Sequence, residues 1–215
     1  MSLLQIVKTS TSLLLRGDWR EFYLRTLIAL GRVDLETVTI DKLNLSPEQA
    51  HSYSDSGRED LQKVLAALEI RQGDAVVDFG CGKGGALITL AEYDFSKITG
   101  IEISAALTGI ARKNLSRLKI DNVEVVCCDA GKFTDLDAYN YCYFFNPFPG
   151  AVMTEVLQNL ARSLNRRPRK MTIIYLNPEC HDRIIEHGVF RKVAEFNHAS
   201  HVFFVYSNDP ESSNR

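Results

Sequence analysis

The sequence lacks the features that mark several classes of protein. It carries no excess of charge, because 25 Lys and Arg residues nearly balance 27 Asp and Glu residues and leave a formal net charge of -2. This balance removes the strongest compositional sign of a non-specific nucleic-acid or anionic-membrane binder. The cysteines are odd in number and show neither a C-x-x-C pair nor a zinc-ligand spacing. This pattern excludes a disulfide scaffold and favours reduced thiols in a cytoplasmic protein. They are Cys81, Cys127, Cys128, Cys142 and Cys180.

Long hydrophobic runs are also missing. The mostly apolar stretches 3–7 and 13–15 are separated by the polar residues 8–12, and neither a basic segment nor a small-residue cleavage site accompanies them. A membrane-spanning helix needs about 20 predominantly apolar residues. We therefore expect no signal peptide, no transmembrane span and no membrane partner.

The length of 215 residues fits one α/β domain with a short extension. Small polar residues cluster at 51–57, where the apolar periodicity lapses, so we expect an N-terminal helical extension over 1–52, a main domain over 53–209 and a mobile tail over 210–215. The extension contains an apolar stripe at helical spacing that ends at a glycine, and it predicts a helix packed on the domain or on a second subunit. The stripe and its end are Trp19, Phe22, Tyr23, Leu27, Leu30 and Gly31.

Beyond residue 58 the pattern alternates between helices and strands. Helices are expected over 61–68, 86–91, 104–118, 152–164 and 180–187, and strands over 75–79, 97–102, 123–128, 139–145, 171–176, 190–196 and 201–206. Such alternation produces right-handed crossovers and a parallel sheet covered on both faces. The sequence therefore predicts a doubly wound, Rossmann-like, mostly parallel seven-stranded sheet that closes with an antiparallel hairpin.

A glycine-rich loop is the sharpest motif. The apolar strand 75–79 runs into Gly80, Gly82 and Gly84 and then into a helix, a context in which the backbone can approach a ligand closely. Glu102 closes the next strand, where a carboxylate can accept hydrogen bonds from ribose hydroxyls. We interpret the loop as an adenosine site.

The details of the loop indicate which adenosine cofactor it would bind. Dinucleotide sites use G-x-G-x-x-G, whereas this loop has one residue between successive glycines and Asp78 two residues before the first. A carboxylate there would repel a pyrophosphate but suits an ammonium group. S-adenosylmethionine combines adenosine with an amino-acid tail, so we predict that cofactor. An NAD-dependent dehydrogenase is disfavoured by the same spacing and by the lack of a Tyr-x-x-x-Lys pair.

The run V-D-F-G-C-G-K-G at 77–84 resembles the first motif of the class I S-adenosylmethionine-dependent methyltransferases, and the likeness extends over about residues 53–206. The resemblance implies that the acid and glycines of this motif hold the methionine tail, Glu102 the ribose, and the acid after the third strand the adenine amino group. The cofactor-binding residues so implied are Asp78, Gly80, Cys81, Gly82, Gly84, Glu102, Ile103, Asp129, Ala130 and Asn146, with Tyr53 in a covering segment.

The chain also resembles a bacterial group of methyltransferase-domain proteins through three further elements. A G-V-D-T-like element corresponds to 32–37, a Y-x-P-[ST] element to 53–56, and F-N-P-F to 145–148. The second departs from the pattern because Asp55 replaces proline. In the family this segment often folds over the cofactor, which implies a lid role for Tyr53, Ser54 and Asp55, with a helix N-cap as the alternative. The group implies no substrate.

Asn146 is the candidate for orienting the methyl acceptor. It ends the fourth strand in N-P-F-P, a partial match to the N-P-P-[FY] element of methyltransferases that act on planar amino nitrogens. A turn-forming Asn before Pro is the alternative interpretation. Because the sulfonium is already activated, alignment of the acceptor can suffice and no His or Cys is required. Cys81 is expected to fill space.

Histidines and a cluster of basic residues are two further groups that could form a binding site. His181, His187, His198 and His201 have no metal-ligand spacing and are expected at the surface, so no metal is predicted. A basic cluster at a helix C-terminus is expected to be solvated, with contact to RNA or another polyanion as the alternative. The basic cluster comprises Arg162, Arg166, Arg167, Arg169 and Lys170.

Taken together, the motifs favour a methyltransferase whose acceptor is a protein side-chain nitrogen or a small metabolite. A non-catalytic cofactor-binding or assembly module is the alternative, and an RNA or nucleobase methyltransferase is less favoured. The oligomeric state, monomer or homodimer, stays open.

Overall fold

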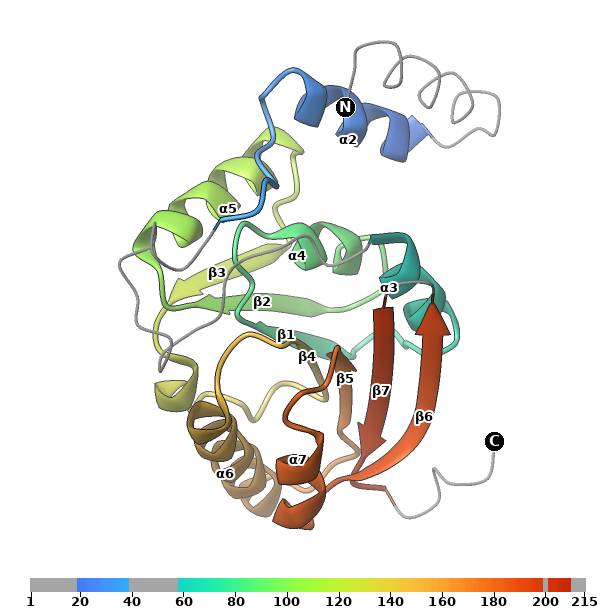
Figure 1. Cartoon of the computed structure of the whole chain (residues 1–215), viewed down its shortest axis with the longest axis vertical. Coiled ribbons are helices and arrows are strands. Elements are labelled where there is room, and N and C mark those ends of the chain that lie inside the picture. Colours follow the sequence, from blue (N-terminus) through green and yellow to red (C-terminus); the bar gives the residue numbers. More distant parts are fainter. Residues whose placement is uncertain (1–18, 39–57, 199–200, 210–215) are drawn as a thin grey trace.

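A seven-stranded sheet forms the centre of the protein (Figure 1). The computed structural model describes residues 19–38, 58–198 and 201–209. The strands are β1 (Ala75–Phe79), β2 (Lys97–Glu102), β3 (Val123–Cys127), β4 (Tyr141–Phe145), β5 (Thr172–Leu176), β6 (Arg191–His198) and β7 (His201–Ser207). They lie in the order β3-β2-β1-β4-β5-β7-β6, with β1 to β5 parallel and β7 antiparallel to both β5 and β6.

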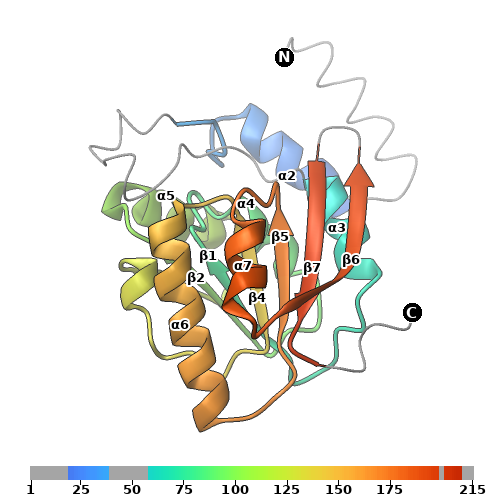
Figure 2. The ribbon, with the colours of Figure 1, turned by 60° about the horizontal axis from the view of Figure 1, so that its bottom comes forward.

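Helices cover both faces of the sheet, as Figures 1 and 2 show. One face carries α2 (Trp19–Ala29), α3 (Arg58–Ala66), α4 (Gly85–Leu90) and α5 (Ala105–Arg117), and the other carries α6 (Gly150–Arg166) and α7 (His181–His187). Successive strand residues point to opposite faces, so Val76 packs in the first core and Val77 in the second. All five residues of β1 are buried, as expected for a central parallel strand.

The strand order reverses beside β1. The chain passes from β1 to β2 and β3 on one side and then returns to β4 on the other side of β1. The carboxyl ends of these strands diverge at this reversal, where open α/β sheets bind ligands. The fold therefore positions the glycine loop after β1 at the expected ligand edge.

The predicted fold class is confirmed, and the predicted strands agree with the observed ones to within two residues at most of their ends. The fourth strand begins at Tyr141 rather than at Tyr139, because residue 139 belongs to a turn that closes on Leu136. The closing hairpin is present, and its register shifts between Lys192 and Ala194, a β-bulge in the outer strand β6. All five cysteines are free thiols, as predicted. Over the described ranges, no helix is long and apolar enough to cross a membrane.

The extension helix α2 packs through a different face from the one predicted. Its buried residues are Leu24 and Leu27, whereas Trp19 and Leu30 are each 66% exposed and Tyr23 is 49% exposed. Leu24 was absent from the predicted stripe, and of the stripe's members only Leu27 is buried against the domain. The expected boundary at residue 52 lies outside the described residues.

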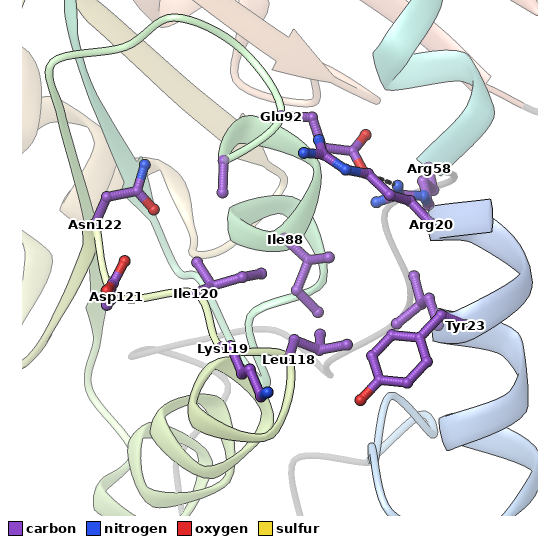
Figure 3. Close-up of a pocket in the computed structure, with 12 residues that line it drawn as sticks. Arg20, Tyr23, Arg58, Ile88, Glu92, Leu118, Lys119, Ile120, Asp121 and Asn122 are labelled. Atoms are coloured by element: carbon purple, nitrogen blue, oxygen red, sulfur yellow. Dashed lines mark hydrogen bonds and ion pairs between the residues drawn. The ribbon is translucent and has the colours of Figure 1, made fainter. Parts of the chain in front are cut away.

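An ion-pair network explains the orientation of α2. Arg58, at the start of α3, donates from Nε to Glu21 Oε2 at 2.8 Å and from Nη1 to Thr89 Oγ1 at 3.2 Å, and its Nη2 pairs with Glu92. Glu21 also pairs with Arg25 of its own helix, at 2.6 Å. The network lies beside a cavity of about 270 Å³ between α2, the end of α4 and the α5–β3 loop (Figure 3). Polar pairing at α2 thus decides which apolar side chains face the domain.

We expect Arg58→Met to destabilise the fold by about 2 kcal/mol, because two partly buried carboxylates lose a charged partner. Arg71→Met is the matched control, since its pair with Glu69 is exposed and should be worth less than about 1 kcal/mol. Urea unfolding followed by circular dichroism measures both. Trp19, the single tryptophan, reports on α2 by fluorescence. Equal stability of the two variants would show that the network does not hold α2.

Candidate cofactor site

The glycine loop has the backbone conformation that its sequence requires. Gly80, Gly82 and Gly84 have φ angles of 80°, 54° and 87°, values that favour glycine, and α4 begins at the next residue. A Cβ built on Gly80 would lie 2.2 Å from Cβ of Pro147. The loop after β4 therefore crosses directly over Gly80, so two strand ends contribute to one surface.

Glu102 ties this loop to the end of β2. Its Oε2 accepts a hydrogen bond from the Gly82 amide at 3.0 Å, and its Oε1 accepts one from the Ser104 amide at 2.8 Å. The side chain is 6% exposed. Burial raises the pKa of Glu102 even though these amides act in the opposite direction. Each carboxylate oxygen has a second lone pair, so Glu102 can still accept from a ligand hydroxyl.

Asp78, in β1 just before the loop, is also buried. It is 2% exposed, and its Oδ2 accepts no hydrogen bond from any residue within the described ranges. Burial, followed by the nearby charge of Glu102, raises the pKa of Asp78 well above its ordinary value. A buried carboxylate oxygen without a donor is costly. The position therefore suits a ligand that brings a cationic donor, as the ammonium end of S-adenosylmethionine would.

A small cavity opens at the ends of β1 and β2. It brings together five predicted residues, Gly80, Glu102, Ile103, Asp129 and Ala130, and adds Ile101, Cys128, Pro147, Phe148 and Val152. Its walls are largely apolar, with a carboxylate from each of two strand ends. The cavity encloses about 30 Å³, less than the volume of a nucleoside, but the chemistry of its lining suits one, since apolar walls can cover a flat ring and the acids can accept hydrogen bonds. Ile101 and Val152 carried no sequence pattern of their own; their places follow from register and from the first turn of α6.

Cys81 and Gly84 of the glycine loop pack against neighbouring residues of the protein. Cys81 is buried, and a Cβ on Gly100 would lie 2.7 Å from its Sγ, so the thiol fills the space left by that glycine. Burial, followed by the charges of Asp78 and Glu102, raises the pKa of Cys81 well above its ordinary value. The thiol therefore stays protonated and is a poor nucleophile. Gly84 faces Ala111 of α5.

Asp129 is fixed where it lines the cavity. Its Oδ1 accepts a hydrogen bond from the Gly131 amide at 2.9 Å and caps the short helix η2 (Ala130–Lys132). This local bond keeps the aspartate at the cavity and leaves lone pairs for a ligand amino group.

Asn146 lies one residue after β4 with a left-handed φ of 37°, a conformation that Asn tolerates. The Tyr175 hydroxyl donates to Asn146 Oδ1 at 3.3 Å and accepts from the Cys180 amide at 3.3 Å. Asn146 is not among the residues that line the cavity. Phe148 is 3% exposed and packs edge-on against Phe144, so its ring belongs to the core as well as to the cavity wall.

The predicted lid residues Tyr53, Ser54 and Asp55 lie outside the described residues. No group of three or more His, Cys, Asp or Glu side chains in the described ranges could hold a metal ion. Two of the histidines have polar partners instead. His181 Nδ1 lies 2.9 Å from the Tyr206 hydroxyl, and His201 Nδ1 lies 2.9 Å from Asp60.

The basic cluster binds its own protein. Arg166 Nη2 donates to Asp137 at 2.7 Å, and Arg169 donates to the carbonyls of Leu136 and Tyr139 at 2.8 and 2.6 Å. The bond from Arg166 holds the pKa of Asp137 at about 2. These bonds join the end of α6 to the loop before β4, at the sheet edge opposite the cavity. Arg167 also donates to the Asp137 carbonyl, and Lys170 pairs with Asp209, so four of the five cations bind other parts of the protein.

Comparison with known proteins agrees with this geometry. Residues 76–167 match the sequence model of a family described as "Methyltransferase domain". A 73-residue stretch is 33% identical to (S)-tetrahydroprotoberberine N-methyltransferase of Eschscholzia californica and covers 34% of this chain and 21% of that protein. A 135-residue match is 30% identical to a tRNA/tmRNA (uracil-C(5))-methyltransferase of Colwellia psychrerythraea and covers 55% of this chain and 36% of that protein. The chain thus spans well under half of these relatives.

A solved structure shares the fold more completely. A SAM dependent methyltransferase from Aquifex aeolicus superposes with a TM-score of 0.57 at 19% identity, covering 71% of this chain and 93% of that one. At this identity the likeness concerns the fold, a doubly wound sheet. Residues 76–167 thus match a methyltransferase domain, and the chain shares its doubly wound fold with a solved methyltransferase.

Proposed function

We propose that the chain binds S-adenosylmethionine at the cavity beside Gly80 and transfers its methyl group to an acceptor near Asn146. The observation that carries the proposal is the buried carboxylate of Asp78, whose Oδ2 has no donor among the described residues, set beside the Glu102 carboxylate at the next strand end. A cationic amino-acid tail and a ribose satisfy these two acids together. A pyrophosphate would be repelled by both.

Each residue of the site would then hold one part of the cofactor. Asp78 accepts from the ammonium group, the loop at Gly80 and Gly82 lies against the tail, Glu102 accepts from ribose hydroxyls and Asp129 from the adenine amino group. The cofactor supplies a methyl group that its sulfonium has already activated. The protein therefore needs to align the acceptor and exclude water, with a base only where the acceptor must lose a proton.

Asn146 is proposed to orient the acceptor. Its side chain can accept from and donate to a polar acceptor group, and the bond from Tyr175 restricts its rotation. The names of the relatives given above specify N-methylation of (S)-tetrahydroprotoberberine and methylation of uracil C5 in tRNA/tmRNA, so the matched region does not determine the acceptor. We propose a protein side-chain nitrogen or a small metabolite, because the basic cluster that would favour RNA is partly engaged within the protein.

A second candidate is a non-catalytic cofactor-binding or assembly module. The observation that favours it is the exposed apolar surface of α2, with Trp19 and Leu30 each 66% exposed. Binding of S-adenosylmethionine without methyl transfer to any fraction of a cell lysate would support the module.

Asp78→Asn should increase stability and weaken cofactor binding. A buried Asp whose pKa is raised contributes stability at pH values below its ordinary value of 3.8, and this stability is lost as the pH rises through the raised pKa. At pH 7–8 the neutral Asn should therefore stabilise the ligand-free protein by about 1 kcal/mol. Loss of the ammonium partner should weaken S-adenosylhomocysteine binding by about 30-fold or more.

Thermal unfolding between pH 5 and pH 8 and calorimetric titration measure the two effects of Asp78→Asn. Asp121→Asn is the matched control, because it removes one exposed charge from the loop at the opposite edge of the sheet. A variant that binds S-adenosylhomocysteine as tightly as the wild type would contradict the cofactor assignment.

Asn146→Ala should slow methyl transfer by about 10- to 100-fold, an effect typical of losing one orienting hydrogen bond. Affinity for S-adenosylhomocysteine should change less than about twofold, because the acceptor, not the cofactor, loses its partner. Methyl-labelled S-adenosylmethionine incubated with fractionated lysate measures transfer and shows whether label enters protein, RNA or small molecules. Asn122→Ala, an exposed Asn at the opposite edge, is the control. Unchanged transfer by the Asn146 variant would remove this residue from the proposal.

A further inference from the structure

Lys83 lies within the glycine loop, yet its side chain is only 3% exposed. Its ammonium group donates to Asp34 Oδ1 at 2.6 Å. Asp34 comes from the extension, 49 residues earlier in the chain, and belongs to the segment 32–37 that resembled a recurring element without a role. Burying an ammonium group is costly unless an acid accompanies it. The loop conformation that buries Lys83 thus depends on a residue outside the cofactor motif.

A second side chain joins the same two segments. Asn114 of α5 is 1% exposed, and its Oδ1 accepts from the Asp34 amide at 3.0 Å. Its Nδ2 donates to the carbonyl of Asp34 at 2.8 Å and to the carbonyl of Lys83 at 3.0 Å. Val33, next to Asp34, is 1% exposed and packs in the core of this sheet face. The extension is therefore built into the wall behind the glycine loop.

The loop is held from both sides. Glu102 accepts from the Gly82 amide on the cavity side, while Asp34 and Asn114 bind Lys83 on the far side. Gly82 and Lys83, adjacent residues of one short loop, thus bind two different parts of the chain. Because these residues are consecutive, the two sets of contacts act on neighbouring positions of the same backbone.

We infer that Asp34 is a positioning residue for the cofactor: its ion pair with Lys83 holds the glycine loop in the binding conformation and couples cofactor binding to the docking of segment 33–38. The inference rests on the proposed function. Coupling between two sites is reciprocal, so a bound cofactor must also stabilise the docked segment.

Asp34→Asn isolates the ion pair. The Asp34 side chain is 45% exposed, and the bonds between Asp34 and Asn114 use only the Asp34 backbone, so the variant retains them. Calorimetric titration should show S-adenosylhomocysteine binding weakened by about tenfold, within the range typical of coupled sites. Glu36→Gln, an exposed acid two residues away, removes the same charge and should leave affinity within about twofold of the wild type. In a Lys83→Met background, Asp34→Asn should have no further effect.

Hydrogen exchange provides a readout that a purely structural role would not change. In the wild type, S-adenosylhomocysteine should slow exchange of the amides in 33–38, and Asp34→Asn should abolish that protection. A wild type that fails to bind S-adenosylhomocysteine overturns the proposed function and this inference with it. A wild type that binds without protecting 33–38, or an Asp34 variant that binds as tightly, overturns the inference alone.

Discussion

The pair of hydrogen bonds that the Glu102 carboxylate accepts from Gly82 and Ser104 is the interaction on which the ligand edge depends. It connects the loop after β1 to the end of β2 and starts α5, so one side chain sets the relative position of three elements. Glu102 also lines the cavity that the strand ends enclose. A carboxylate used in this way both builds the site and remains available to a ligand.

The fold could be predicted from the sequence because its local patterns agree with one another. Five short apolar runs, four of them followed by a turn and a helix, leave few topologies other than a doubly wound sheet. The conformation of the glycine loop could also be predicted, since glycine tolerates the positive φ angles observed at Gly80, Gly82 and Gly84. Asp78 and Glu102 followed from strand register, because acids at the carboxyl ends of neighbouring parallel strands meet.

What the sequence did not indicate depends on contacts between distant segments. The residues of α2 that face the domain could not be identified from the stripe alone, because Glu21 pairs with Arg58 across 37 residues and Leu24, not Trp19, is buried. The pairing of Asp34 with Lys83 was also not predictable from the sequence, because neither residue lies in a local pattern that identifies its partner. Val152 joins the cavity only because α6 starts beside the strand reversal. These contacts join segments that are distant in the sequence and are identified only by distances in the structure, whereas periodicity concerns neighbours within one helix or strand.

The bulge between Lys192 and Ala194 has a consequence for the protein's solubility. Among the residues that the structure describes, β6 is the last strand of the sheet, and one row of its backbone amides and carbonyls has no neighbouring strand there. Such a border invites strands from other molecules and can seed aggregation. The irregular register twists this border, and the charged residues Arg191, Lys192 and Glu195 lie along it. The β6–β7 hairpin therefore also disfavours pairing of β6 with strands of other molecules.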